Sequence, residues 1–314
     1  MTEANPDATA RSATRPFGMI GELINNSFAR ARRAWSDRDL DAYQHLARLQ
    51  TGLGADALTV NVDGTQALRV RPEEMLDFIP DLVPALQEAT SLPLAFDNPS
   101  VAFHRKCLET YDAKRNGPAI FNSVAASREE LDAMYELIAE HDTMVIVMAS
   151  ERFTEKGSAQ CSSGQHAYES ARHFVEILHE RAGRRNEHII IDPGLAPISA
   201  DTYGLVNMGL DAMRLIRGDP DLEGVHISVG LTNFSFGVPK GIRLGLENAY
   251  VTIAMEAGLD YVLGNPEKDL QPLDPDDRFM DVVLQALEEG RPGEGESQED
   301  AGFRQSVRIM DLYK

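Results

Sequence analysis

Amide, carboxylate and hydroxyl side chains recur where eight short apolar segments of this 314-residue chain end. They are Glu22, Asn25, Asn61, Asp63, Asp97, Asn98, Asn122, Ser123, Ser150, Glu151, Asp192, Thr232, Asn233, Ser235 and Asn265. A single Asn or Asp in such a place is explained by turn formation or by capping of the next helix. A polar group after all eight segments suggests a shared purpose, because carboxylates accept hydrogen bonds from N–H groups while amides both donate and accept. Brought together, these side chains would suit a neutral, nitrogen-rich heterocycle.

The sequence lacks the motifs of several other chemistries. It has no Gly-x-Ser-x-Gly motif and no P-loop, and none of its eight histidines stands in a His-x-His or His-Glu-x-x-His pattern. A hydrolase of that type and a histidine metal site are therefore disfavoured, and we expect no bound metal. The two cysteines, Cys107 and Cys161, are too few for a disulfide framework, and we expect reduced thiols without a catalytic role.

The eight apolar segments are short and mostly rich in Val, Ile or Leu, which is typical of strands buried on both faces. They are Gly18–Ile24, Ala57–Val62, Leu94–Phe96, Ala119–Phe121, Met144–Met148, His188–Ile191, Val225–Val229 and Tyr261–Leu263. Amphipathic stretches with helical spacing lie between them. These are Asp39–Leu53, Pro72–Thr90, Ser127–His141, Gln165–Arg181, Ala200–Arg217 and Arg243–Ala257.

This alternation predicts a parallel sheet, and eight units predict a closed (β/α)8 TIM barrel. The active sites of such barrels lie at the carboxyl ends of the strands, where the polar side chains stand. The alternative is an open doubly wound sheet, which would need a Gly-rich phosphate loop after the first strand, and Gly-Glu-Leu-Ile-Asn-Asn is not one. His188 and His226 begin strands, so we expect them at the opposite end of the barrel.

We expect the barrel to occupy residues 17–275. Residues 1–16 have no apolar core, which predicts a disordered tail rather than a secretory signal. Residues 276–314 are expected to hold a helix, a disordered acidic Gly/Glu linker and a weakly held terminal segment that could dock as a helix or serve an interface. These three parts are Arg278–Glu289, Gly290–Asp300 and Phe303–Leu312.

The net charge is −20, from 50 acidic against 30 basic residues. Such a field disfavours binding to nucleic acid or to an anionic membrane, and no apolar run is long enough to span a bilayer. We therefore expect neither partner, and a cytoplasmic location. A small ligand or a protein partner remains compatible with this charge.

Six motifs in order carry a family resemblance. They are Gly21–Asn25 (GELIN), Ala55–Val62 (ADALTVNV), Phe96–Asn98 (FDN), Phe121–Ser123 (FNS), Ile191–Gly194 (IDPG) and Gly230–Gly237 (GLTNFSFG). Each motif is weak alone. Together, over Phe17 to Pro266, they resemble the pterin-binding methyltransferases, namely the methyltetrahydrofolate:corrinoid methyltransferases and the folate domain of cobalamin-dependent methionine synthase.

The resemblance implies roles for particular residues. Asp97, Asn122 and Asp192 would hold the pterin ring, with Asn61, Asn233 and Glu22 in the matching strand-end motifs. Asn233 would reach the ring nitrogen that carries the methyl group. The expected catalytic residues are Asn233 and Asp97. A positioned amide can stabilise the developing protonated form of that nitrogen, a tertiary amine that is otherwise a poor leaving group.

Two departures from the family pattern stand out. The family often has Asp where this chain has Thr59, so one contact is lost or replaced, and Asp63 is the expected substitute. The last motif is followed by Val-Pro-Lys rather than an Arg-containing sequence, and Lys240 or Arg243 is the expected substitute as a partner for the folate tail.

The resemblance further implies tetrahydrofolate or methyltetrahydrofolate as substrate, a homodimer, and a corrinoid (cobalamin) that accepts or donates the methyl group. The chain has no Asp-x-His-x-x-Gly corrinoid-binding motif, so the corrinoid is expected on a partner protein. One alternative is a dihydropteroate synthase, although the Ser-Arg-Lys and Arg-x-His segments of that family are missing. The other is a non-catalytic folate-binding protein, which the Thr59 departure keeps open.

Overall fold

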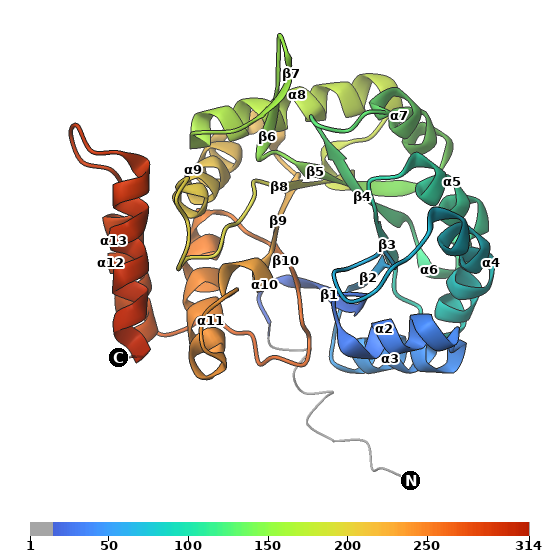
Figure 1. The fold of residues 1–314 in the computed structure, drawn as a ribbon. Coiled ribbons are helices and arrows are strands. Elements are labelled where there is room, and N and C mark those ends of the chain that lie inside the picture. The colour runs from blue at the N-terminus through green and yellow to red at the C-terminus, as the bar shows by residue number, and fades with distance from the viewer. Residues whose placement is uncertain (1–14, 314) are drawn as a thin grey trace.

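Eight parallel strands close into a barrel in the computed structural model, which describes residues 15–313 (Figure 1). Around the barrel the order is β1-β10-β9-β8-β5-β4-β3-β2, and β1 closes the ring by pairing with both β2 and β10. The predicted (β/α)8 fold is therefore confirmed. The strands are β1 Gly18–Asn25, β2 Ala57–Asn61, β3 Leu94–Asp97, β4 Ala119–Ala125, β5 Thr143–Met148, β8 Ile189–Asp192, β9 His226–Gly230 and β10 Tyr261–Gly264.

Helices enclose the ring of strands (Figure 1). They are α2 Ala29–Asp37, α3 Leu40–Gly52, α4 Pro72–Ala89, α5 Val101–Thr110, α6 Ala113–Asn116, α7 Leu131–Glu140, α8 Gly164–Ala182, α9 Leu205–Gly218, α10 Leu231–Phe234, α11 Lys240–Ala257, α12 Arg278–Glu289 and α13 Gln298–Met310. Short 3-10 turns lie at η1 Asn186–His188, η2 Pro220–Leu222 and η3 Asp311–Tyr313. Each predicted helix is present; the predicted helix Arg278–Glu289 has the same bounds as α12, and the others have shifted ends. The sequence patterns missed α2, α5, α6, α10 and an antiparallel hairpin after β5, made of β6 Glu151–Thr154 and β7 Gly157–Gln160.

The start of α9 shows why helix ends shift. The prediction began this helix at Ala200, but the helix begins at Leu205. The carboxylate of Asp201 accepts hydrogen bonds from the backbone N–H groups of Leu205 and Val206, at 2.8 and 2.9 Å. An Asp before the first turn satisfies donors that have no partner inside the helix, so the residues up to Asp201 remain in the loop.

The barrel interior is filled by an apolar layer below its mouth. Ile20, Ala57, Ala95, Ile120, Ile146 and Ile190 form one buried cluster inside the ring, while a larger cluster packs between strands and helices. Side chains two residues apart on a strand point to the same face. The positions two residues beyond this layer are therefore also interior, and they hold Glu22, Thr59, Asp97, Asn122, Met148 and Asp192.

The C-terminal region differs from the prediction. We expected a disordered linker over Gly290–Asp300 and a weakly held end, but α13 begins at Gln298 and packs along α12. The backbone N–H of Asp300 donates to the hydroxyl of Ser297, so the acidic run forms the first turn of a capped helix. The last three residues of the predicted linker are therefore helical, because the Ser297 cap starts a helix that composition alone does not reveal. Phe303–Leu312, for which docking as a helix was one expectation, lies in α13 and η3.

The opposite end of the chain lies mostly outside the described residues, which include only Arg15 and Pro16 of the predicted tail 1–16. Within residues 15–313, no helix has the length and apolar character needed to cross a membrane.

Candidate active site at the mouth of the barrel

The predicted pterin-binding side chains lie on one end of the barrel, at the carboxyl ends of the strands. Asp97 of β3 is the register partner of Asn122 of β4. Asp192 ends β8, which β5 separates from β4, and its register partner on β5 is Met148. Asp97 and Asp192 are half-buried and Asn122 is buried, so the three line a polar layer directly above the apolar filling.

Asn61 lies against Asp97. The Asn61 amide nitrogen donates to Asp97 Oδ2 at 3.1 Å. Burial raises the pKa of Asp97, while the Asn61 hydrogen bond and the positive charge of Arg128 lower it. Asn61 therefore orients the Asp97 carboxylate and favours its ionised form, in which both oxygens accept hydrogen bonds.

Asp192 is held by the turn that follows β8. The backbone N–H of Gly194 donates to Asp192 Oδ1 at 2.8 Å. Gly194 has φ of +89°, and a side chain there would collide with Ser150, so glycine is required at this position. Burial raises the pKa of Asp192 to about 6, opposed by the Gly194 hydrogen bond.

Asn233 lies on the one-turn helix α10, next after β9. Its side chain is exposed, and a side chain at Gly230 would lie 3.2 Å from its amide nitrogen, so glycine leaves the amide room. Asn233 follows β9, whereas Asn61 and Asp97 lie on β2 and β3, which β10 and β1 separate from β9 around the ring.

Glu22 lies on β1 and is 6% exposed. The hydroxyl of Thr232, next to Asn233, donates to Glu22 Oε1 at 2.5 Å. Burial raises the pKa of Glu22 to about 7; Thr232 and Lys268 lower it, and Glu247 raises it further. A carboxyl group with a pKa of about 7 is therefore bonded to Thr232, the chain neighbour of the residue expected to meet the reacting nitrogen.

A model of the pterin binding enzyme family matches residues 24–264 of this chain, well over half of it. The chain belongs to the pterin-binding enzyme family. The resemblance read from the six motifs is confirmed. The polar layer at the mouth is the natural candidate for the pocket of this pterin-binding enzyme, because active sites of such barrels lie at that end.

Two curated relatives are similar over most of the enzyme. The methylcorrinoid:tetrahydrofolate methyltransferase of Eubacterium limosum is 24% identical over 251 residues, which cover 79% of this chain and 84% of that protein. The methionine synthase of Mycobacterium tuberculosis is 25% identical over 262 residues, or 80% of this chain. The aligned part makes up 20% of that methionine synthase.

Solved structures share the fold. A dihydropteroate synthase from Yersinia pestis in a sulfonamide drug complex superposes with a TM-score of 0.57 at 19% identity, covering 82% of this chain and 90% of that one. The dihydropteroate synthase of Coxiella burnetii with pteroic acid gives 0.56 at 16% identity, covering 87% and 94%. At these identities the likeness shows the fold alone.

Some of the amide side chains at strand ends hydrogen-bond within the turn that follows the strand. The side-chain oxygens of Asn25, Asn98 and Asn265 accept from backbone N–H groups two residues later, at 2.8 to 2.9 Å. Turn formation therefore explains these three positions.

Three charged residues of the site were missed by sequence reasoning. Glu247 of α11 is fully buried, accepts from the Ser235 hydroxyl and pairs with Lys268 Nζ at 2.6 and 2.8 Å. Arg128 follows β4, bonds to the carbonyl and hydroxyl oxygens of Ser123, and lowers the pKa of both Asp63 and Asp97. A carboxylate on the apolar face of a helix could have flagged Glu247, whereas no local pattern marks Arg128 or Lys268.

The family departure at Thr59 has a visible consequence. Thr59 is fully buried, and its hydroxyl oxygen finds no hydrogen-bond partner within the described part of the chain. Asp63 lies at the mouth, where its carboxylate accepts from the Asn98 amide and the neighbouring Asp97 raises its pKa. The replacement of the family Asp by Asp63 stays a prediction.

The residues predicted to meet the folate tail lie at the start of α11. Lys240 is exposed, and Arg243 Nε donates to the carbonyl of Val238 at 2.8 Å. Their role also stays a prediction. Cys107 and Cys161 are buried, and burial raises the pKa of both thiols. Among residues 15–313, no group of three His, Cys, Asp or Glu side chains is arranged to hold a metal ion.

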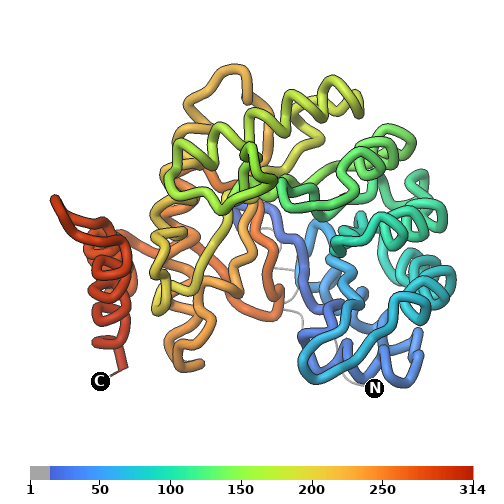
Figure 2. The backbone as a smooth tube through the Cα atoms, turned by 45° about the horizontal axis from the view of Figure 1, so that its top comes forward, coloured from blue at the N-terminus to red at the C-terminus, as the bar shows by residue number. Residues whose placement is uncertain are grey.

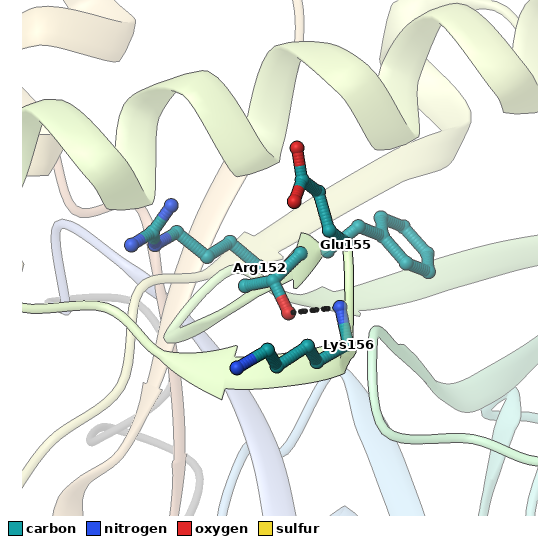
Figure 3. A pocket seen from close by; sticks show the side chains of 5 residues that line it. Arg152, Glu155 and Lys156 are labelled. Atoms are coloured by element: carbon teal, nitrogen blue, oxygen red, sulfur yellow. Dashed lines mark hydrogen bonds between the residues drawn. The ribbon is translucent and has the colours of Figure 1, made fainter.

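An open hollow of about 620 Å³ lies at the β6–β7 hairpin (Figure 3). It is lined by Arg152, Phe153, Thr154, Glu155 and Lys156, all from one short segment. None of the predicted site residues lines it. A surface hollow made by one turn gives no converging polar groups, so it is not the candidate pocket.

Proposed function

We propose that this pterin-binding enzyme moves a methyl group between N5 of tetrahydrofolate and a corrinoid carried by a partner protein. The observation that carries the proposal is the polar layer of Asp97, Asn122 and Asp192 below an exposed amide, Asn233, at one mouth of the barrel. Similarity to the E. limosum methyltransferase over 84% of its length supports the same reaction.

The polar layer fits the edge of a pterin ring. That edge presents an amino group and ring N–H donors beside carbonyl and ring-nitrogen acceptors. Asp97 and Asp192 supply carboxylate acceptors, and Asn122 supplies both a donor and an acceptor. The two carboxylates lie on opposite sides of Asn122 around the ring of strands, so the heterocycle would be gripped along its edge.

Methyl transfer requires the N5 amine to become a better leaving group. In the proposed reaction Asn233 donates its amide N–H to N5, a bond that strengthens as positive charge grows there. A reduced corrinoid supplies the nucleophile that accepts the methyl group. The remaining task of this chain is to hold the folate in line for that displacement.

The reaction also needs a proton. When N5 loses its methyl group it ends as N–H, so transfer from methyltetrahydrofolate consumes one proton and the reverse reaction releases one. The Asn233 amide cannot supply a net proton. We assign storage of this proton to the carboxyl group of Glu22. Glu22 accepts a hydrogen bond from Thr232, the residue before Asn233.

An assay with purified protein tests the proposal. Methyltetrahydrofolate with cob(I)alamin, or tetrahydrofolate with methylcobalamin, should give methyl transfer. The Asp192→Ala variant should bind tetrahydrofolate about tenfold to a hundredfold more weakly, since it loses a charged hydrogen-bond acceptor. Tetrahydrofolate binding without transfer in the wild type would contradict the proposal and favour a non-catalytic folate-binding protein.

The second candidate is a dihydropteroate synthase, because the solved structures with this fold carry that name. That reaction releases pyrophosphate and calls for cations around the leaving group. The same preparation should therefore be given dihydropterin pyrophosphate and p-aminobenzoate. Formation of dihydropteroate and pyrophosphate would establish the second candidate, and no turnover is the expected result. The predicted homodimer is tested by sedimentation, and the predicted cytoplasmic location by cell fractionation.

A further inference from the structure

The C-terminal helix α13 touches the loop that leaves the candidate site. The α12–α13 pair stands beside the barrel next to α9 and α11 in both backbone views (Figures 1 and 2). The Asn207 amide of α9 donates to the carbonyl of Leu287 in α12 at 2.9 Å, which ties the pair to the barrel. From this position α13 faces the loop of residues 193–204, between β8 and α9.

Two side chains of α13 donate to backbone carbonyls of that loop. The Gln305 amide nitrogen donates to the carbonyl of Ile198 at 3.0 Å, and Gln305 is 1% exposed. The Ser306 hydroxyl donates to the carbonyl of Ser199 at 2.7 Å. Carbonyls in a loop lack the partners that a strand or helix provides, so these two bonds satisfy groups that would otherwise depend on water.

The far end of the loop is also fixed by α13. A side chain at Gly302 would collide with the carbonyl of Asp201, so helix and loop are in direct contact there. Asp201 is 2% exposed, is hydrogen-bonded by Gln305 and caps the first turn of α9. The loop is therefore held against α13 at Ile198, Ser199 and Asp201.

The same loop reaches both halves of the site. It follows Asp192, whose carboxylate is oriented by the loop residue Gly194. In its middle, the backbone N–H of Ile198 donates to the carbonyl of Phe234 at 3.1 Å, and Phe234 follows Asn233 on α10. Ile198 thus connects Gln305 on one side with the Asn233 turn on the other.

We infer that α13, through Gln305 and Ser306, is a positioning element of the active site that fixes the turn carrying Asn233. Its effect on methyl transfer rests on the proposed function, whereas its effect on the loop does not. A one-turn helix has few hydrogen bonds of its own, so its orientation depends on the segments bonded to it.

Hydrogen exchange of the full chain tests the inference. Gln305→Met keeps the side-chain volume but leaves the Ile198 carbonyl unsatisfied, and Ser306→Ala removes the second donor. We expect amide exchange in residues 195–204 and 231–238 to become about five- to tenfold faster in each variant, as for a lost buried hydrogen bond. Arg308→Gln is the matched control, because Arg308 bonds to Glu289 within the helix pair and not to the loop.

Kinetics on the same variants provide the second readout. Gln305→Met should lower the turnover number about tenfold while tetrahydrofolate affinity changes less than about threefold, because Asn233 acts on the transition state. Arg308→Gln should leave both values unchanged. Unchanged exchange in both segments for both α13 variants would overturn the inference. So would equal acceleration in the control, because that would indicate general loosening of the helix pair.

The two proposals fail in distinguishable ways. If the wild type transfers no methyl group, the proposed function fails, but the exchange experiment still decides whether α13 holds the loop. If exchange quickens as expected while turnover stays unchanged, α13 braces the loop without positioning Asn233, and the inference is contradicted in its catalytic part.

Discussion

The two sides of the barrel mouth are built differently. On the β2–β4 side, Asn61, Asp97 and Asn122 stand on neighbouring strands and need only strand pairing to meet. On the β9–β1 side, Glu22 accepts from Thr232, the neighbour of Asn233, and forms a cluster with Glu247 of α11 and Lys268 from the loop after β10. The arrangement of the β2–β4 side can be predicted from the local strand pattern, whereas that of the β9–β1 side depends on contacts between distant segments.

This difference suggests that the two sides of the mouth have different roles in the reaction. The β2–β4 side presents hydrogen-bonding groups of fixed direction, which suits recognition of the pterin ring. The β9–β1 side combines a carboxyl group that titrates near neutrality with an exposed amide, which suits a step involving a proton. Four substitutions can break or sharpen the comparison, beginning with the largest expected effect.

Lys268→Met should destabilise the fold. It leaves the fully buried Glu247 carboxylate without its cation, and the loss should be about 3 kcal/mol, the lower end for a broken buried pair because Lys268 is 27% exposed. Urea denaturation measures the free energy of unfolding. The exposed pair Arg30–Glu267 is the control, and Arg30→Gln should cost less than about 1 kcal/mol. An equal loss of unfolding free energy in Lys268→Met and Arg30→Gln would show that the buried pair stabilises the fold no more than a surface pair.

Glu22→Gln should change the pH dependence of stability. Because burial raises the pKa of Glu22 from 4.5 to about 7, the folded protein binds this proton more tightly than the unfolded chain. Ionisation of Glu22 therefore lowers the free energy of unfolding as the pH rises between those values. The variant has no ionisable group there and does not show this decrease. Relative to wild type it should gain about 2–3 kcal/mol between pH 5 and pH 8. Parallel curves of unfolding free energy against pH would show that Glu22 does not titrate there.

Asp97→Asn tests the recognition side. It keeps the shape but loses one charged acceptor, so tetrahydrofolate affinity should fall about tenfold to a hundredfold. Calorimetric titration gives the affinity. Asp63→Asn is the matched control, since Asp63 bonds to Asn98, and its effect should be smaller. A larger loss in the control would move the recognition site to Asp63.

Arg128→Gln should have the smallest effect. The Arg128 charge lowers the pKa of Asp97, so its removal raises that pKa, and Asp97 becomes protonated at a higher pH as the solution is acidified. Tetrahydrofolate affinity should be nearly unchanged at pH 8 but about threefold weaker than wild type at pH 5, as for a partly solvated charge pair. Affinity measured across this range should show the shift, and its absence would mean that Arg128 does not support Asp97.

The same contrast explains what the sequence could predict. Eight apolar segments and the two-residue period of strands were enough to predict the barrel and to place Asp97, Asn122 and Asp192 at its mouth. Each of them lies two residues after a residue of the interior layer, namely Ala95, Ile120 and Ile190. The family motifs then supplied the proposed roles, which no contact in the structure tests by itself.

The rest lay beyond local pattern. The partner of Glu247 is 21 residues away and that of Glu22 is 210 residues away, and no periodicity encodes such contacts. The docking site of the C-terminal helix could not be predicted for a similar reason, because Gln305 reaches a carbonyl 107 residues earlier in the chain. Composition predicted disorder there, whereas the Ser297 cap and the buried face of α13 determine the structure.

A single-turnover measurement of methyl transfer with Asn233→Ala tests the central claim most directly. Wild-type protein saturated with methyltetrahydrofolate is mixed with cob(I)alamin, and Asn265→Ala serves as control because the Asn265 side chain caps its own turn. We predict that Asn233→Ala slows transfer about 10²–10³-fold, with folate affinity within about threefold of wild type and the control unchanged. Wild-type transfer rates in Asn233→Ala would contradict the account.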